Sequence, residues 1–143
     1  MKSIHILLVE DNEGDILLTT EALQEGRIVN KISVTRDGKQ AVDFLSKTGD
    51  YKNAQVPDFI LLDINLPKKN GHEVLQFIKT NDKLKHIPVI MLTTSSSEAD
   101  ISLSYNYHAN CYITKPVEVG DFMDAVMKME DFWINIVKLP NKK

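Results

Sequence analysis

The chain has 143 residues, the length of one domain, and a formal net charge of -3. Hydrophobic residues make up 43% and charged residues 26% of the chain, which excludes a disordered or fibrous protein. The charge does not indicate a nucleic-acid surface, and no apolar run approaches the roughly 20 residues that span a bilayer. The single cysteine, Cys111, cannot form an intrachain disulfide, so we expect a cytoplasmic protein.

Five short segments rich in branched aliphatic residues recur along the chain and predict β-strands. Residues 4–9, 59–62 and 89–92 are nearly continuous apolar runs, which is typical of central strands buried on both faces of a parallel sheet. Residues 31–36 alternate between apolar and polar side chains, which favours an edge strand. Residues 111–114 form the fifth predicted strand, which we expect at the other edge.

Apolar residues recur at helical spacing between the first four strands, at 16–23, 41–45 and 71–78. After the fifth strand, Phe122 and Ala125 belong to the stripe of a further amphipathic helix. Strands that alternate with helices predict an α/β fold in which each crossover is a helix. We expect a (βα)5 fold, a doubly wound five-stranded parallel sheet with helices on both faces and the flavodoxin-like strand order 2-1-3-4-5.

Polar side chains follow four of the predicted strands. Glu10 and Asp11 follow the first strand, Asp63 the third, Thr93 the fourth and Lys115 the fifth. Because the carboxyl ends of parallel strands meet at one edge of the sheet, where such folds bind ligands, we expect one site there. For any single acid a solvated loop position or a helix cap is the simpler explanation, but it gives no reason for four strand ends to agree.

Three carboxylates at one edge repel each other and raise one another's pKa unless a cation lies between them. Mg2+ binds oxygen ligands in near-octahedral geometry and keeps several waters, so two carboxylates and a main-chain carbonyl suffice. We expect Asp11 and Asp63 as direct ligands and the carbonyl of Asn65 as the third. Glu10 is expected to bind the ion through a water molecule.

Phosphoryl transfer to a carboxylate requires little beyond positioning and charge neutralisation. Lys115 and the metal could share the phosphoryl oxygens, and the Thr93 hydroxyl could donate to a third oxygen. The site therefore predicts phosphorylation of Asp63, with Asp63, Thr93 and Lys115 as the groups that act on the phosphoryl group.

The chain contains the segments LLVEDN, LLDINLPKKNG, VIMLTT and CYITKP. In their order and spacing these segments resemble the response-regulator receiver domain, and the resemblance covers nearly the whole chain. The resemblance implies that Asp63 is the phosphoacceptor and that Glu10 and Asp11 hold the metal. It also implies that Thr93 is the switch hydroxyl and Lys115 the lysine of the family. We expect a single receiver domain over residues 1–143.

Three further positions bear on the switch. Tyr112 matches the aromatic residue of the family whose rotamer follows the movement of Thr93, although it could also be a half-buried core tyrosine. The resemblance implies a cis peptide bond before Pro116. Thr94 stands where the family usually has a smaller side chain, and its bulk leaves the rates of phosphorylation and hydrolysis open.

A narrower resemblance covers EDNEGD, DINLPKKNGHEVL, ANCYITKPV and DFWINIVKLP, which are similar to the single-domain regulators that partner phytochrome-type sensor histidine kinases. It implies a two-component regulator without an output domain, which receives its phosphoryl group from such a kinase. Phosphorylation would change the face formed by the fourth helix, the fifth strand and the fifth helix, and this face would transmit the signal. We expect no enzymatic activity beyond slow autodephosphorylation.

The apolar stripe of the last helix continues into residues 130–143, which we expect to extend that helix. A solvent-facing stripe of this kind predicts an interaction surface, here a homodimer, although the tail could instead cover its own core. The predicted interface residues are Phe122, Phe132, Trp133, Ile136 and Val137.

Two other classes of function are less consistent with the residues present. A phosphatase with an aspartyl nucleophile needs an acid two residues after it, and that position is Asn65, whose amide has no useful proton. A flavodoxin-like FMN binder needs a Gly/Ser/Thr-rich loop after the first strand, and the acidic loop at residues 10–15 would repel the phosphate.

Overall fold

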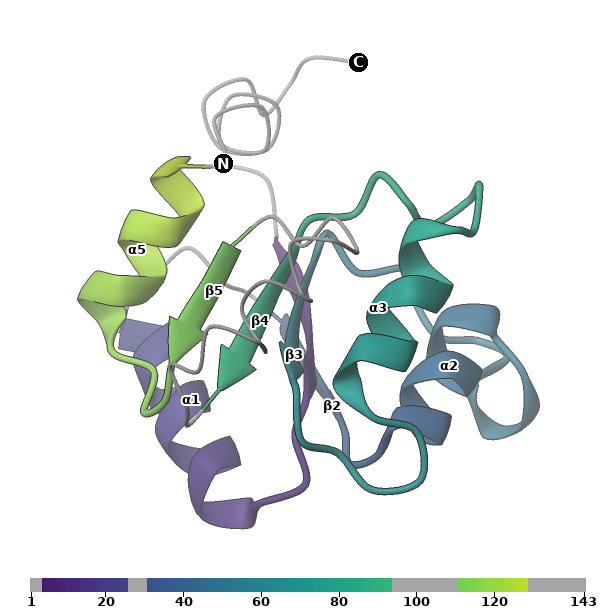
Figure 1. Cartoon of the computed structure of the whole chain (residues 1–143), viewed down its shortest axis with the longest axis horizontal. Helices are drawn as coiled ribbons and strands as arrows, with labels where there is room; N and C mark the ends of the chain where they lie inside the picture. The colour runs from purple at the N-terminus through teal and green to yellow at the C-terminus, as the bar shows by residue number, and fades with distance from the viewer. Residues whose placement is uncertain (1–3, 26–30, 94–110, 129–143) are drawn as a thin grey trace.

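The computed structural model describes residues 4–25, 31–93 and 111–128, which form an α/β fold with one five-stranded parallel sheet (Figure 1). The strand order is β2-β1-β3-β4-β5, which confirms the predicted flavodoxin-like topology. The strands are β1 (His5–Val9), β2 (Lys31–Thr35), β3 (Phe59–Asp63), β4 (Val89–Thr93) and β5 (Cys111–Thr114). The helices are α1 (Glu13–Glu25), α2 (Gly38–Ser46), α3 (Gly71–Lys79) and α5 (Val119–Lys128), with a 3-10 turn at Gly49–Tyr51. The crossover from β4 to β5 lies outside the described residues.

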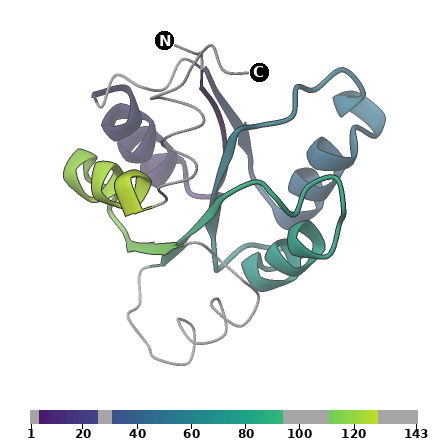
Figure 2. The same ribbon diagram turned by 90° about the horizontal axis from the view of Figure 1, so that it is seen from above.

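Helices cover both faces of the sheet, with α1 and α5 on one face and α2 and α3 on the other (Figure 2). Every residue of β1, β3 and β4 is buried, as expected of central parallel strands. Neighbouring strand residues alternate between two core clusters. Leu8 and Leu61 pack on the α1/α5 face, whereas Leu7 and Leu62 pack on the α2/α3 face.

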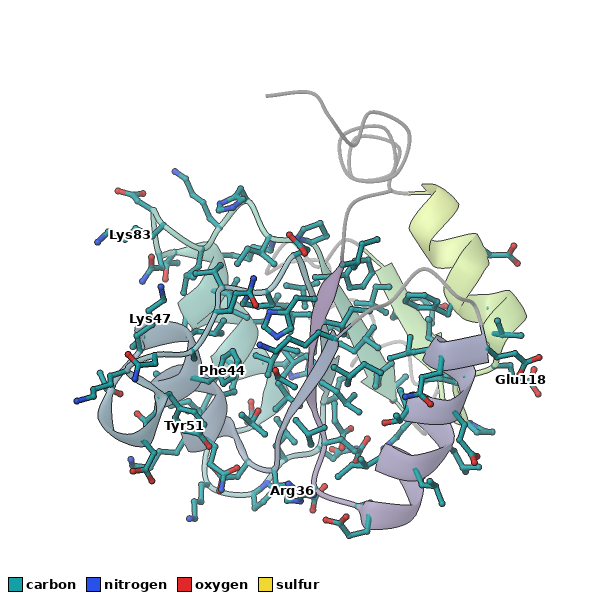
Figure 3. The ribbon with its side chains drawn as sticks, turned by 180° about the vertical axis from the view of Figure 1, so that it is seen from behind. Arg36, Phe44, Lys47, Tyr51, Lys83 and Glu118 are labelled. Atoms are coloured by element: carbon teal, nitrogen blue, oxygen red, sulfur yellow. The ribbon has the colours of Figure 1, made fainter. Side chains whose placement is uncertain are left out.

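The α2/α3 face also contains a small aromatic cluster. The Phe44 ring lies 5.5 Å from the Tyr51 ring and 6.2 Å from the His5 ring between ring centroids, and Figure 3 labels Phe44 and Tyr51 on this side of the molecule. Burial lowers the pKa of His5, and the charge of Lys31 acts in the same direction. These contacts attach α2 and the turn after it to β1.

Phe122 is a core residue of the described chain. Its side chain is only 1% exposed, and its ring centroid lies 5.9 Å from that of Phe59 on the α1/α5 face. The prediction that Phe122 lies at an interface is therefore wrong, because the core uses this part of the α5 stripe. The other predicted interface residues, Phe132, Trp133, Ile136 and Val137, lie outside the described residues.

The loop from β3 to α3 is held by backbone hydrogen bonds at both ends. The Ile64 amide donates to the Leu92 carbonyl (3.0 Å), and the Gly71 amide donates to the Ile64 carbonyl (2.9 Å). Asn70 and Glu73 then form a capping box at the start of α3. The chain is thus fixed directly after the last residue of β3.

Among residues 4–25, 31–93 and 111–128, no helix is both long and apolar enough to cross a bilayer.

Candidate functional site

The predicted polar residues lie at the carboxyl ends of the strands, at the lower edge of the sheet in Figure 1. Asp63 is the last residue of β3 and Thr93 the last residue of β4, each one residue beyond the apolar run that predicted the strand. Glu10 directly follows β1, and Lys115 directly follows β5. The parallel register aligns these strand ends, since it pairs Asp63 with Leu92 and Thr93 with Thr114.

Three carboxylates form a compact acidic cluster at this edge. One carboxylate oxygen from each of Glu10, Asp11 and Asp63 lies within 4.8 Å of the others. Glu10 and Asp63 are buried, whereas Asp11 is exposed, so the cluster is open to solvent on one side. Hard divalent cations prefer such oxygen ligands and retain part of their water shell. The donor atoms present therefore fit Mg2+ or a similar ion.

Lys115 lies among the carboxylates. Its ammonium nitrogen is 2.9 Å from Glu10 Oε1, 3.0 Å from Asp15 Oδ2 and 3.5 Å from Asp63 Oδ2. Burial alone would lower the pKa of Lys115, but hydrogen bonds to Glu10 and Asp15 outweigh burial and raise it. Lys115 is therefore held as a cation. The amide of Lys115 donates to the Thr93 carbonyl (2.7 Å), and a cis peptide bond follows to Pro116, as the resemblance implied.

Burial dominates the electrostatics of Glu10. Its carboxylate is fully buried, and burial raises its pKa to about 7. The hydrogen bond from Lys115 opposes this rise, and the charge of Asp63 adds to it. A carboxylate with these neighbours is stabilised by a second cation, which is the role expected of the metal.

Different groups contact the two oxygens of Asp63. The Asn65 amide donates to Oδ1 at 3.2 Å, and the Lys115 ammonium lies near Oδ2. Asn65 itself is exposed, and its carbonyl remains a predicted metal ligand. Asp63 is only 3% exposed, so its carboxylate is positioned by the protein rather than by water.

Thr93 is fully buried at the end of β4. The next residue, Thr94, lies outside the described residues. Tyr112 is half-buried, pairs with Met91 in the sheet register and packs against the core cluster on the α2/α3 face. These positions are compatible with the predicted switch and with a plain core tyrosine. The roles of Thr93 and Tyr112 remain predictions.

Asp15 also belongs to the site, although its sequence position did not indicate this. It lies in the first turn of α1, where its amide donates to Asn12 Oδ1 (2.9 Å), so Asn12 acts as a helix cap. Its carboxylate pairs with Lys115, 100 positions later in the chain. The sequence signal was an additional acid four residues after Asp11.

We expect Mg2+ or Mn2+ to stabilise the folded wild-type chain by about 2.7 kcal/mol when the ion concentration is a hundred times the dissociation constant. The thermal midpoint should rise accordingly. Asp11→Asn should remove most of this increase, because it replaces a ligand, and should stabilise the metal-free chain by reducing repulsion in the cluster. Differential scanning fluorimetry with and without the ion measures both effects. Asp50→Asn, which removes an exposed acid from the 3-10 turn at Gly49–Tyr51, is the control. An unchanged metal response in Asp11→Asn would exclude Asp11 as a ligand.

Known proteins are similar to this chain in both sequence and fold. The chain is 47% identical over 135 residues to the response regulator Rcp1 of Synechocystis sp., an alignment covering 94% of this chain and 92% of Rcp1. The Mn2+-bound crystal structure of Rcp1 matches with a TM-score of 0.77, covering 96% of this chain and 99% of that one.

Two solved structures of other regulators are also similar. The bacteriophytochrome response regulator AtBRR is 44% identical with a TM-score of 0.84, covering 93% of this chain and 96% of AtBRR. The phosphorylated cyanobacterial phytochrome response regulator RcpA is 46% identical with a TM-score of 0.79, covering 97% of this chain and 99% of RcpA. Residues 6–127 match the family described as the response regulator receiver domain. The fold, the acidic edge of the sheet and these similarities identify the chain as a member of the response regulator receiver domain family.

Proposed function

We propose that the chain is a phosphoacceptor switch in which Asp63 takes a phosphoryl group from a histidine of a sensor kinase. An Asp63 carboxylate oxygen attacks the phosphorus, the bond between phosphorus and the imidazole nitrogen breaks, and the nitrogen keeps the electron pair. The observation that carries the proposal is the contact between the Asp63 carboxylate and the buried Lys115 ammonium, within an acidic cluster. The phosphorylated structure of the relative RcpA supports it.

Glu10, Asp11, Asp63 and the Asn65 carbonyl would hold Mg2+, which supplies positive charge to the phosphoryl oxygens. The Mn2+-bound structure of Rcp1 supports a divalent ion at this kind of site. Lys115 would provide a second positive charge to the phosphoryl group. The Thr93 hydroxyl would donate to a further phosphoryl oxygen.

Phosphorylation adds about -1.5 to -2 charges at neutral pH and draws in hydroxyl and ammonium donors. The movement of Thr93 would be passed to Tyr112, which lies on β5, and would alter the face formed by the fourth helix, β5 and α5. A chain of this kind signals by changing a surface. It needs no catalytic turnover beyond slow autodephosphorylation.

Incubation with a small-molecule phosphodonor and Mg2+ should add one phosphoryl group to the wild-type chain, as an acid-stable and base-labile adduct. Asp63→Asn should reduce incorporation by about a hundredfold or more, because an amide is a poor nucleophile. Intact-mass spectrometry measures the adduct. Asp82→Asn, which changes an exposed acid, should behave as the wild type. Comparable incorporation into Asp63→Asn would place the phosphoryl group on another residue and refute the proposal.

The kinase would contact the chain on α1, which starts beside the acidic cluster. Leu17 is 59% and Leu18 50% exposed on this helix, and large apolar side chains at this level of exposure favour a protein partner. The relatives AtBRR and RcpA are phytochrome response regulators, which supports a phytochrome-type kinase as the partner.

Leu17→Ser and Leu18→Ser should slow transfer from an autophosphorylated phytochrome-type kinase by about tenfold each, as expected for apolar interface contacts. Phosphorylation by a small-molecule donor should be unchanged, because it requires only the site. Val56→Ser, at an exposed apolar position elsewhere, is the control for lost surface hydrophobicity. Equal losses with both donors would indicate a defect of the site and not of docking.

The chain would form one cytoplasmic receiver domain over residues 1–143, with residues 130–143 extending α5 into a homodimer contact. This part of the proposal rests on the apolar residues Phe132, Trp133, Ile136 and Val137. Light scattering of the wild type and of Trp133→Arg, with and without phosphodonor, tests it. A monomer under all conditions would favour a tail that covers its own core.

A further inference from the structure

The Lys115 ammonium lies closer to two other carboxylates than to the phosphoacceptor. It is 2.9 Å from Glu10 and 3.0 Å from Asp15, but 3.5 Å from Asp63. The Lys115 side chain is only 8% exposed, so these carboxylates replace the water that an ammonium would otherwise bind. The described structure thus holds Lys115 in a resting position between three acids.

The two nearer acids differ in how easily they can release the lysine. The Glu10 side chain is fully buried and belongs to the acidic cluster, so losing Lys115 would leave a buried charge to be neutralised by other means. The Asp15 side chain is 30% exposed and can be hydrated when its partner leaves. The pair between Asp15 and Lys115 is therefore the one that can open at low cost.

A phosphoryl group on Asp63 changes the balance of charge around Lys115. Its additional negative charge and its acceptor oxygens compete with Asp15 for the same ammonium. The backbone of Asp15 is held by the hydrogen bond from its amide to Asn12 Oδ1, so Asp15 cannot follow Lys115 as a whole residue. Movement of Lys115 toward the phosphoryl group must then lengthen or break its contact with Asp15.

We propose that Asp15 is a positioning residue that retains Lys115 in the resting state and opposes its movement to the phosphoryl group. The inference rests on the proposed function, because it requires a phosphoryl group on Asp63. Asp15 acts through Lys115 and does not touch the reacting atoms. Its loss should therefore favour the phosphorylated state, in contrast to the loss of a group that stabilises the phosphoryl group itself.

Asp15→Asn should raise the affinity for beryllofluoride, a tetrahedral analogue of the phosphoryl group, by about fivefold in the presence of Mg2+, the size expected for one charge-assisted hydrogen bond at a partly exposed position. The rate of phosphorylation by a small-molecule donor should rise by a similar factor. Isothermal titration calorimetry measures the first quantity, and intact-mass spectrometry the second.

Glu13→Gln is the matched control. Glu13 is also an acid in the first turn of α1, so the variant removes the same interaction with the helix dipole. The Glu13 carboxylate instead pairs with Arg36, with 2.7 Å between Glu13 Oε2 and Arg36 Nε. Both side chains are exposed, and Figure 3 labels Arg36. Glu13→Gln should leave beryllofluoride affinity unchanged, and Asp15→Glu should restore part of the wild-type restraint.

The role of Lys115 is tested by repeating Asp15→Asn in a Lys115→Met background. The fivefold effect should disappear there, because Asp15 then has no lysine to retain. Unchanged or weaker beryllofluoride binding by Asp15→Asn, or a gain that persists without Lys115, overturns the inference. If the wild type binds no beryllofluoride and accepts no phosphoryl group, the proposed function fails as well, so the two failures are distinguishable.

Discussion

Replacing Lys115 with methionine should lower the free energy of unfolding of the metal-free chain by about 3 kcal/mol, the cost of leaving a buried charge without its partner. Methionine keeps most of the volume of the buried stem and removes the cation. The fully buried Glu10 and the buried Asp63 would then face each other with no positive charge between them. Protonation of Glu10, whose pKa is already about 7, limits the loss. Urea denaturation followed by circular dichroism at pH 8 measures it.

Two further variants separate lost charge from lost packing. Adding Glu10→Gln to Lys115→Met should recover much of the stability, because the buried position then contains no carboxylate. Lys85→Met removes an exposed lysine whose partner, Asp82, lies 3.3 Å away and is also exposed, so it should cost less than about 1 kcal/mol. A loss for Lys115→Met no greater than that for Lys85→Met would show that Lys115 does not stabilise the acidic cluster.

Adding a methyl group at Gly71 or Gly38 should destabilise the fold by about 3 kcal/mol, because the new atom would overlap backbone that cannot rotate away. A Cβ on Gly71 would lie 2.3 Å from the Asp63 carbonyl oxygen and 2.7 Å from Ile64 Cα. A Cβ on Gly38 would lie 1.8 Å from the Lys69 carbonyl oxygen. Gly71→Ala should also slow phosphorylation of Asp63, since relief of the overlap displaces the end of β3.

Gly120→Ala provides the matched control for these substitutions. Gly120 lies in the first turn of α5, and a Cβ there would meet nothing within 4 Å. Alanine is favoured over glycine in a helix, so this variant should gain about 0.5 to 1 kcal/mol. Thermal and urea denaturation should therefore give opposite signs for Gly71→Ala and Gly120→Ala. Equal stability of the two variants would exclude close backbone packing beneath the site.

Much of the site could be predicted from local patterns. The apolar runs before Asp63 and Thr93 are long enough to be strands, and strands joined by helical crossovers are parallel. Parallel strands bring their carboxyl ends to one edge, so a polar residue after each run belongs to a common site. The acidic cluster of Glu10, Asp11 and Asp63 follows from this rule without knowledge of any side-chain contact.

The pairing of Lys115 with Asp15 could not be predicted in this way. The sequence placed the lysine at the correct edge, but its pairing with Asp15 depends on how α1 leaves β1 and where the first turn of α1 lies relative to β5. The close approach of Gly38 to the loop at Lys69 is likewise set by packing of α2 against the loop after β3. Both contacts join residues that are distant in the sequence.

The sequence by itself determined which segments are strands and which are helices, because a period of two or 3.6 residues is a local property of the chain. It also determined the chemistry at the carboxyl ends of the strands. Only the tertiary structure decided that Phe122 belongs to the core and that Lys115 rests against Asp15. The physical reason is that a helical stripe defines a face of its own helix, whereas the partner of that face depends on the angle and distance at which the elements pack.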